Sequence, residues 1–317
     1  MSLLPEPDAP VYVAGHRGLA GSAIWRELRS RGFENLIGWS SSELDLRDAT
    51  ATMAAIQSVR PAVVIMAAAR VGGIQANSDD PVHFLNDNLR IQTNVFSAAH
   101  AADVDRLLFL GSSCIYPKLA PQPIPESALL TGPLESTNRA YALAKIAGIV
   151  AVQSYRAQYR RRWISAMPTN LYGPGDNFNL RTAHVLPALI RRFDDARAQG
   201  AREVVLWGSG TPRREFLHAD DLARAAVFLM DKYDNDEHVN VGTGSDISIA
   251  DLAALVADLV GFRGDLSWDT SRPDGTPRKR LDTRVINDLG WSPSVGLREG
   301  IEAVHGWYRE NVSALRS

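Results

Sequence analysis

The chain has 317 residues, of which 45% are hydrophobic and 22% are charged, and its formal net charge is -2 at pH 7. This length allows one large α/β unit or two joined lobes with a substantial core. The near-neutral charge excludes an electrostatic case for binding nucleic acid or an anionic membrane surface. We therefore expect neither as a partner, and specific sites have to be found in local motifs.

Cys114 is the single cysteine, so no disulfide can form within the chain. No stretch approaches the roughly 18 apolar residues of a membrane span. The first ten residues lack the basic and apolar regions of a signal peptide. We expect a cytoplasmic protein without a membrane segment.

Apolar runs of strand length alternate with amphipathic stretches of helix length in the first half of the chain. The pattern predicts strands at 11–14, 36–39, 62–67, 106–110 and 163–167. Between them it predicts helices at 19–31, 49–59, 82–101 and 140–160. Unbroken apolar runs such as VVIMAAA are typical of parallel strands with both faces buried. The predicted fold class is therefore α/β, with a doubly wound parallel sheet of the Rossmann type.

The regular alternation weakens after about residue 170. We expect a dinucleotide-binding Rossmann domain at 1–170 and a smaller α/β substrate-binding lobe at 171–317. The boundary is soft, because 204–207 and 238–241 are also strand-like and fit either sheet. Five prolines within 117–133 predict a loop between a strand end and the next helix.

Gly15, Gly18 and Gly21 form the pattern GxxGxxG directly after the first predicted strand and at the start of the first predicted helix. The first two glycines allow a tight turn and close backbone approach, and the third lets the helix pack on the strand. The free N–H groups and positive dipole end of the helix favour a pyrophosphate there. A plain strand-to-helix turn would use similar residues, but the place of the motif in the chain favours a bound dinucleotide.

The residues after the second predicted strand bear on which nicotinamide dinucleotide is bound. No acidic residue follows Trp39 until Glu43, and Arg17 lies in the glycine loop. An acid at this strand end favours a free ribose 2′-hydroxyl, and a cation favours a 2′-phosphate. We predict NADP(H), with Arg17 as the main phosphate ligand, although a solvated loop arginine is the alternative. The other predicted contacts in this half are His16, Leu19, Ser41, Ser42, Leu44, Asp45, Leu46, Ala67, Ala68 and Ala69.

Tyr141 and Lys145 form YxxxK near the start of a predicted helix, so both side chains lie on one helical face. We expect the lysine ammonium to lower the pKa of Tyr141 and so prepare it to exchange a proton with a carbonyl oxygen. Ser112 follows the fourth predicted strand, at the sheet edge where ligands of such folds bind. These three residues form a predicted catalytic group.

Ser112, Tyr141 and Lys145 match the Ser, Tyr and Lys of the extended short-chain dehydrogenase/reductase family, which the chain resembles. Longer blocks between residue 15 and about 280 resemble the GDP-L-fucose synthase family. These blocks are GHRGLAGSAI, GSSCIYPKLAPQPIPE, AYALAKIAGI, MPTNLYGPGDNF, WGSGTPRREFLH and RPDGTPRK. The resemblance implies NADPH-dependent conversion of GDP-4-keto-6-deoxy-D-mannose to GDP-L-fucose, by epimerisation at C3 and C5 and then reduction at C4. It also implies a homodimer formed through the helices near 82–101 and 139–160.

The same resemblance implies roles for single residues. Cys114 and His184 are the implied acid and base of the epimerisation, and both residue types exchange protons near neutral pH. A buried cysteine and a helix-capping histidine are the structural alternatives. The implied contacts to the GDP-sugar are Arg192, Trp207, Arg214 and Asp274. The implied contacts on the nicotinamide side are Leu110, Gly111, Ser112, Tyr141, Lys145, Pro168, Asn170, Leu171 and His184.

Three further arginine and lysine residues, Arg278, Lys279 and Arg280, are candidates for the diphosphate of the substrate, whereas Arg181 and Arg213 receive no role. The alternative function is another nucleotide-sugar 4-epimerase, 4,6-dehydratase or reductase of the same family. A dehydratase usually has an acidic residue beside the serine, which this chain lacks. A cofactor-binding regulator without catalysis is a third hypothesis, and the intact predicted catalytic group argues against it.

Overall fold

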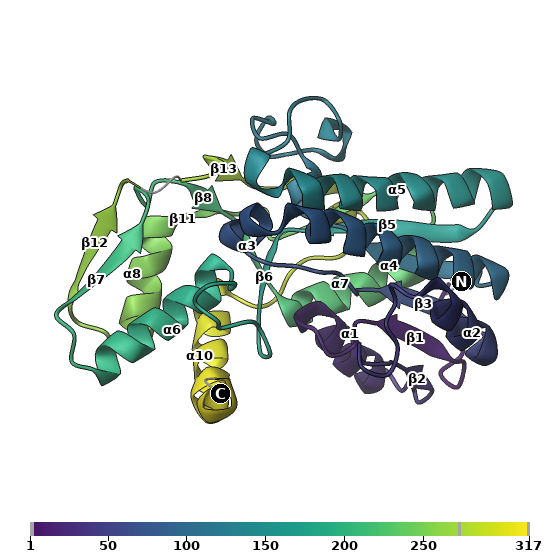
Figure 1. The fold of residues 1–317 in the computed structure, drawn as a ribbon, viewed down its shortest axis with the longest axis horizontal. Coiled ribbons are helices and arrows are strands. Elements are labelled where there is room, and N and C mark those ends of the chain that lie inside the picture. Colours follow the sequence, from purple (N-terminus) through teal and green to yellow (C-terminus); the bar gives the residue numbers. More distant parts are fainter. Residues whose placement is uncertain (1–2, 272–273, 316–317) are drawn as a thin grey trace.

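The computed structural model describes residues 3–271 and 274–315, and its centre is a parallel six-stranded sheet (Figure 1). In spatial order the strands are β10 (Val239–Val241), β5 (Arg162–Pro168), β4 (Arg106–Leu110), β3 (Val63–Met66), β1 (Val11–Ala14) and β2 (Leu36–Ile37). Every neighbouring pair runs parallel. The chain moves outward from β1 in one direction to β2 and then in the other through β3, β4 and β5. A parallel sheet whose strand order reverses at β1 is doubly wound, so the predicted fold class, an α/β fold of the Rossmann type, is confirmed.

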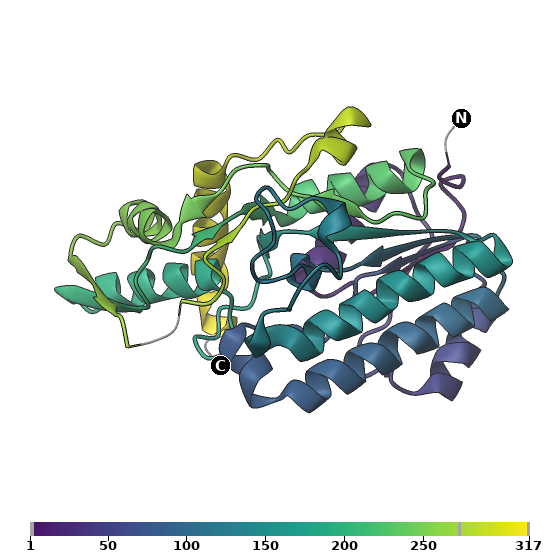
Figure 2. The same ribbon diagram turned by 90° about the horizontal axis from the view of Figure 1, so that it is seen from above.

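Helices cover both faces of the sheet, as the view from above shows (Figure 2). One face carries α1 (Leu19–Ser30) and α7 (Ala219–Lys232). The other carries α2 (Ala49–Val59), α4 (Pro81–Ala101) and α5 (Arg139–Tyr159), with the short α3 (Ile74–Asp79) leading into α4. Because both faces are covered, β1, β3 and β4 are buried at every residue.

The ends of the predicted helices and strands of the first half agree with the structure to within one residue, with one informative exception. The strand predicted to reach Trp39 ends at Ile37. β2 lies at the edge of the sheet and pairs only with Val11 and Tyr12 of β1. Beyond that point β1 pairs with β3 alone, so residues 38 and 39 have no ladder partner and leave the sheet.

The second half of the chain builds a smaller lobe at the carboxyl end of the sheet (Figure 1). Its core lies among α6 (Val185–Ala198), α8 (Ile249–Val260) and α10 (Leu297–Leu315). Short sheets surround this core: β7 (Glu203–Trp207) with β12 (Asp265–Asp269), β6 (Asn170–Tyr172) with β9 (Phe216–His218), and β8 (Arg213–Arg214) between β11 (Ile247–Ser248) and β13 (Arg278–Lys279). Within the described residues no helix has the length and apolar character that crossing a membrane requires.

Two segments of the second half return to the large sheet. β10 pairs with β5, and α7 packs against α1 on one face. The strand-like run 204–207 instead pairs with β12 in the smaller lobe. The division at residue 170 remains our proposal for where the lobes part, with β10, α7 and α9 (Arg284–Asp288) belonging to the Rossmann side.

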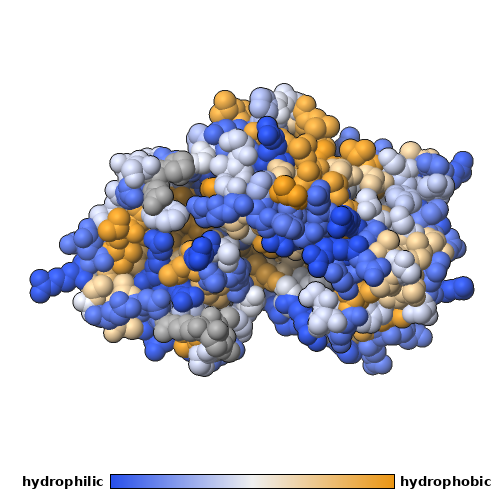
Figure 3. Space-filling model, viewed as in Figure 1, coloured by the Kyte–Doolittle hydropathy of each residue, from blue (hydrophilic) through white to orange (hydrophobic). Residues whose placement is uncertain are grey.

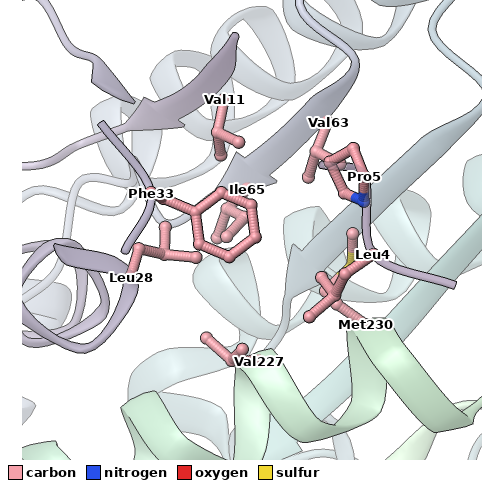
Figure 4. Close-up of a pocket in the computed structure, with 9 residues that line it drawn as sticks. All are labelled: Leu4, Pro5, Val11, Leu28, Phe33, Val63, Ile65, Val227 and Met230. Atoms are coloured by element: carbon pink, nitrogen blue, oxygen red, sulfur yellow. The ribbon is translucent and has the colours of Figure 1, made fainter. Parts of the chain in front are cut away.

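The N-terminal segment closes the edge of the core that lies farthest from the small lobe. Leu4 and Pro5 lie over Val63 and Met230 there, around a cavity of about 10 Å³ (Figure 4). All nine residues that line it are apolar. A space of this size holds one water molecule at most, so it is a packing gap and no ligand site.

A buried polar network joins the loop after β4 to β10. The Tyr116 hydroxyl donates to Asn240 Oδ1 at 2.6 Å and lies 2.9 Å from His238 Nε2. Asn240 Nδ2 donates to the carbonyl oxygens of Ile124 and Asp282. Burial lowers the pKa of His238 to about 4. The network therefore anchors the proline-rich loop with a neutral histidine.

This neutral histidine makes stability depend on pH. In the unfolded chain the His238 pKa returns to its ordinary 6.5, so the unfolded state binds more protons between pH 6.5 and 4. Stability is therefore lost as the pH falls through this window, by about 1.4 kcal/mol per pH unit from this group. We expect urea unfolding at pH 5 to show a lower free energy than at pH 7, and His238→Gln to shrink that difference. An unchanged difference in the variant would assign the pH dependence to other groups.

Candidate active site

A large cleft separates the Rossmann domain from the small lobe, and the space-filling view shows it as the hollow between the two halves (Figure 3). Its volume of about 1890 Å³ exceeds the roughly 300–1,000 Å³ of an ordinary small-molecule pocket, so it has room for two ligands side by side. It lies at the carboxyl ends of the parallel strands. The catalytic and cofactor-binding residues predicted from the sequence line this cleft, as do Arg192, Trp207, Arg214 and Asp274 among the predicted substrate contacts. The roles of these residues remain proposals.

The glycine loop forms a cradle that side chains would fill. Gly15 has a φ of 81°, and a Cβ there would lie 2.8 Å from Ala68 Cα. A Cβ on Gly21 would collide with the Gly15 carbonyl oxygen. Gly18 is the N-cap residue of α1 and no side chain caps this helix, so its first N–H groups face the cleft free of protein side-chain acceptors. The loop therefore fits a pyrophosphate held by backbone donors.

The predicted 2′-phosphate site carries an acid that partly offsets its cation. Glu43 accepts hydrogen bonds from Ser40 N at 2.7 Å and Ser40 Oγ at 2.6 Å, and these bonds lower its pKa. Its carboxylate lies 3.9 Å from the guanidinium of Arg17. Arg47 also lines the cleft, but its guanidinium is bound to the Asp45 carboxylate at 2.7 Å. Arg17 is thus the cation left to meet a phosphate at this end of the cleft.

Ser112, Tyr141 and Lys145 come together where β4 ends and α5 begins. The Lys145 ammonium donates to the Leu110 carbonyl oxygen at 2.8 Å and lies 5.8 Å from the centre of the Tyr141 ring. The side chains of Ser112 and Tyr141 share a hydrogen bond. Burial lowers the pKa of Lys145 to about 7. The structure thus brings together the three residues that the sequence pattern had grouped.

The predicted effect of Lys145 on Tyr141 is wrong in this structure. Burial, and secondarily the neighbouring Cys114, raise the pKa of Tyr141, and the bond with Ser112 offsets only part of this. The lysine is itself buried and bound to a carbonyl oxygen, so its charge does not outweigh the loss of water around the phenol. A raised pKa keeps Tyr141 protonated at neutral pH, which suits a group that donates a proton to a ketone oxygen.

Cys114 and His184 face the same cleft from different lobes. Cys114 lies in the single turn η1 (Ser113–Ile115), and its N–H donates to Ser112 Oγ at 3.3 Å. His184 is the N-cap residue of α6, but its side chain makes no capping bond, so the imidazole is available to the cleft. Loss of surrounding water, and then the charge of Lys279, lower the pKa of His184.

The predicted substrate contacts form the wall of the small lobe. The Arg192 guanidinium lies 5.7 Å from the centre of the Trp207 ring and donates to the Val205 carbonyl oxygen at 3.3 Å. Trp207 is 53% exposed, so part of its indole ring faces the solvent of the cleft. Arg214 is half-buried, and burial lowers its pKa. This wall offers two cations and an aromatic surface.

Asp274 acts on this wall through the backbone. Its carboxylate accepts hydrogen bonds from Ser209 N at 2.7 Å and Ser209 Oγ at 2.8 Å. These bonds fasten the glycine-containing turn after β7, where Gly208 has a φ of 83°. Residues 272–273, which begin the RPDGTPRK block, lie outside the described residues.

The three-residue cluster 278–280 divides between two faces. Lys279 lines the cleft, whereas Arg278 binds Asp246 and the Arg280 N–H donates to Gln122 Oε1. Successive side chains of a strand point to opposite faces, which explains why Lys279 and Arg278 of β13 face different ways. Arg213, left without a role above, also binds Asp246, at 2.8 Å. Arg213 and Arg278 are therefore structural.

One organising residue, Glu215, was missed by the sequence interpretation. It is fully buried between β8 and β9, and its carboxylate accepts hydrogen bonds from the N–H groups of Thr243, Gly244 and Leu281. Its carbonyl oxygen accepts a bond from Asn170 Nδ2 at 2.8 Å. A glutamate after two arginines reads as a surface residue in sequence, so no pattern could have indicated this role.

Comparisons with known proteins agree with the geometry. A model of the NAD dependent epimerase/dehydratase family matches residues 11–242. The chain is 57% identical to "Putative GDP-L-fucose synthase 2" of Arabidopsis thaliana, over 98% of this chain and 95% of that protein. It is 50% identical to "GDP-L-fucose synthase" of Escherichia coli, over 96% of this chain and 98% of that protein. The crystal structure of a GDP-L-fucose synthetase from Naegleria fowleri bound to NADP superposes with a TM-score of 0.91 at 29% identity, covering 100% of this chain and 98% of that one.

Proposed function

Because the chain belongs to the NAD dependent epimerase/dehydratase family, we propose that it is an NADPH-dependent epimerase/reductase that converts GDP-4-keto-6-deoxy-D-mannose to GDP-L-fucose. The observation that carries the proposal is the meeting of Ser112, Tyr141, Cys114 and His184 in one cleft beside the glycine loop. A 4-keto sugar needs these groups together, since its ketone is both the site of reduction and the group that acidifies its neighbours. The near full-length identity to GDP-L-fucose synthases supports the choice of substrate.

NADP(H) fits the Rossmann half of the cleft. Backbone N–H groups of the Gly15–Gly21 loop receive the pyrophosphate, and Arg17 with Ser41 and Ser42 receives the 2′-phosphate. The loop from Ala67 to Ala69 lines the space for the adenosine, and Pro168 to Leu171 line the space for the nicotinamide. When bound, the reduced cofactor supplies the hydride for C4.

Tyr141 and Ser112 bind the oxygen of the C4 ketone in every step. Both hydroxyls donate hydrogen bonds to it, which stabilises the negative charge that develops on oxygen. Tyr141 gives its proton to this oxygen during reduction, and its raised pKa keeps that proton available at neutral pH. Lys145 is fixed by its bond to the Leu110 carbonyl oxygen, and its ammonium lies 5.8 Å from the centre of the Tyr141 ring.

Epimerisation uses the same oxygen site. Removal of the proton at C3 or C5 sends the electron pair toward the ketone and forms an enolate, which Ser112 and Tyr141 hold. Cys114 and His184 approach from different lobes, so one can remove a proton and the other return one on the opposite face. Arg192, Arg214 and Trp207 hold the GDP portion, with the arginines directed at the diphosphate.

Arg17 and Glu43 set the cofactor preference in this proposal. Arg17→Ala removes the cation at the 2′-phosphate, and we expect NADPH affinity to fall roughly tenfold while NADH affinity stays nearly constant. Glu43→Gln is the matched variant, because it removes the opposing carboxylate and is expected to tighten NADPH binding. Fluorescence titration of both nucleotides measures this. An equal loss for NADPH and NADH in Arg17→Ala would contradict the assignment.

We propose a cytoplasmic location, and a homodimer formed through α4 and α5. Leu143 and Val150 are 44% and 46% exposed and lie seven residues apart on one face of α5, and Val82 of the neighbouring α4 is also exposed. Apolar residues on one face at this spacing favour a helical interface. Sedimentation should give a dimer that Val150→Glu weakens and that Gln57→Glu, on the exposed side of α2, leaves intact. A monomer in the unaltered protein would contradict the proposal.

The test of the function is an assay of the purified chain with NADPH and a panel of 4-keto nucleotide sugars. We expect stoichiometric NADPH oxidation with GDP-4-keto-6-deoxy-D-mannose, and a product identified as GDP-L-fucose by NMR. NADPH binding without oxidation of this substrate would reject the proposal. Faster turnover of another 4-keto sugar would favour the alternative of a different nucleotide-sugar reductase, and inversion at C4 without net oxidation would favour a 4-epimerase.

A further inference from the structure

Lys279 faces the sulfur of Cys114 across the cleft. Its ammonium lies 3.7 Å from Cys114 Sγ. Of the four lysines in the chain, Lys118 pairs with Glu135, Lys232 pairs with Asp231, and Lys145 is bound to a carbonyl oxygen. Lys279 pairs with no carboxylate among the residues that the structure describes, and the thiol is the side chain it contacts. An ammonium with a sulfur as its partner favours the thiolate form of that sulfur.

The strand that carries Lys279 is held rigidly on both sides. Its neighbour Arg278 binds the buried carboxylate of Asp246. Gln122 Nε2 donates to the Arg278 carbonyl oxygen at 3.0 Å, while Gln122 Oε1 accepts from the Arg280 N–H at 2.9 Å. On the far side, Glu215 accepts from the Leu281 N–H at 2.8 Å. The ammonium is therefore positioned before any substrate arrives.

The other groups that face Cys114 do not replace this contact. Ser112 accepts from its backbone N–H, and Tyr141 on α5 is a neutral phenol. Arg214 on β8 is the second cation near the sulfur, and its charge interaction with Cys114 is larger than those with Asp274 and Glu135. Its guanidinium donates to the Arg213 carbonyl oxygen at 2.9 Å, whereas the Lys279 ammonium contacts the sulfur itself.

We propose that Lys279 is a positioning residue for the epimerisation, which holds the Cys114 sulfur as a thiolate aimed at the acidic C–H bonds of the sugar. The thiolate takes a proton from C3 or C5, so an S–H bond forms, the C–H bond breaks, and its electron pair enters the enolate. His184, in its imidazolium form, gives a proton to the same carbon from the opposite face, and the enolate electron pair forms the new C–H bond. A proton that passes from the thiol to the imidazole through water then restores both groups. This inference rests on the proposed function, since it assigns a further residue to the same reaction.

The proposal differs from a role as a diphosphate ligand in what each role would change. A ligand of the diphosphate raises KM when it is removed and leaves the free thiol unaltered. A residue that stabilises the thiolate changes the thiol even when no substrate is present. Lys279→Met and Lys279→Arg separate these roles, because one loses the charge and the other keeps it.

The first readout is alkylation of the full-length protein by iodoacetamide as a function of pH. Cys114 is the only cysteine in the chain, so the modification rate reports on that sulfur alone. We expect Lys279→Met to move the pH profile upward and slow the reaction at pH 7 roughly tenfold, and Lys279→Arg to remain near the unaltered protein. Lys232→Met, on the surface, is the matched control. Identical profiles for Lys279→Met and the unaltered protein would overturn the proposal.

The second readout is exchange of solvent deuterium into the substrate. In Lys279→Met the kcat for exchange should fall roughly tenfold with a change of KM below about threefold, and Lys279→Arg should restore it. A raised KM with unchanged exchange would make Lys279 a diphosphate ligand and overturn the proposal. Should Lys279→Met not fold, as circular dichroism reports, Lys279→Gln takes its place. The alkylation result needs no nucleotide sugar, so its failure is distinguishable from failure of the proposed function.

Discussion

Tyr141→Phe is expected to slow the reduction at C4 by roughly 10²–10⁴, the scale of lost general acid catalysis. The phenylalanine keeps the ring, including its edge contact with Phe84 at 6.4 Å, so the local fold should persist. What disappears is the proton donor to the ketone oxygen and the partner of the Ser112 hydroxyl. The measurement is single-turnover NADPH oxidation with bound 4-keto substrate.

Two controls make this result specific to proton transfer. NADPH affinity should be unaltered in Tyr141→Phe, since the glycine loop and Arg17 are untouched. Phe84→Leu alters the same ring contact without touching the hydroxyl, and it should lose much less activity. Near-normal reduction by Tyr141→Phe would remove the tyrosine from its proposed role and leave Ser112 or water as the proton source.

Cys114→Ser is expected to slow exchange of the C3 and C5 protons by roughly 10²–10⁴, because a serine hydroxyl is almost never ionised near neutral pH and cannot replace a thiolate base. The serine is nearly the same size, and its backbone N–H can still donate to Ser112 Oγ. Solvent deuterium incorporation followed by NMR measures the loss. The two half-reactions should separate, so that a substrate already epimerised at C3 and C5 is still reduced.

His184→Gln is the companion variant on the other lobe. It is expected to slow exchange as well, but the retained thiolate should still allow a proton to be removed and returned on one face. Wash-in of deuterium without inversion is therefore the result expected for His184→Gln. An exchange rate in Cys114→Ser equal to that of the unaltered protein would make this cysteine structural and move the base elsewhere.

The glycine loop and the YxxxK spacing were interpreted correctly because backbone geometry over a few residues determines both. Only residues without a Cβ tolerate the turn at Gly15 and the close approach at Gly21, so the glycine loop was evident before any fold was known. A spacing of four puts Tyr141 and Lys145 on one helix face wherever that helix lies. The alternation of buried strands and amphipathic helices likewise predicted the parallel sheet.

Strand ends, burial and pKa values depend on neighbours that are distant in the chain, so local sequence patterns could not predict them. β2 ends two residues early because it is an edge strand, and β10 returns to the sheet from far along the chain. The raised pKa of Tyr141 follows from burial, and the spacing of Tyr141 and Lys145 in the sequence does not indicate how buried the phenol is. Glu215 and Asp246 look like surface acids in the sequence and prove to be buried anchors.

The sequence by itself determined the fold class, the place of the glycine loop and the shared helix face of Tyr141 and Lys145, since each follows from local residue patterns. The tertiary structure alone decided which of three consecutive basic residues enters the cleft. It brought Lys279 to within 3.7 Å of Cys114, which lies 165 residues earlier in the chain. Charge interactions act through space, so only the folded chain could show which cation faces the thiol.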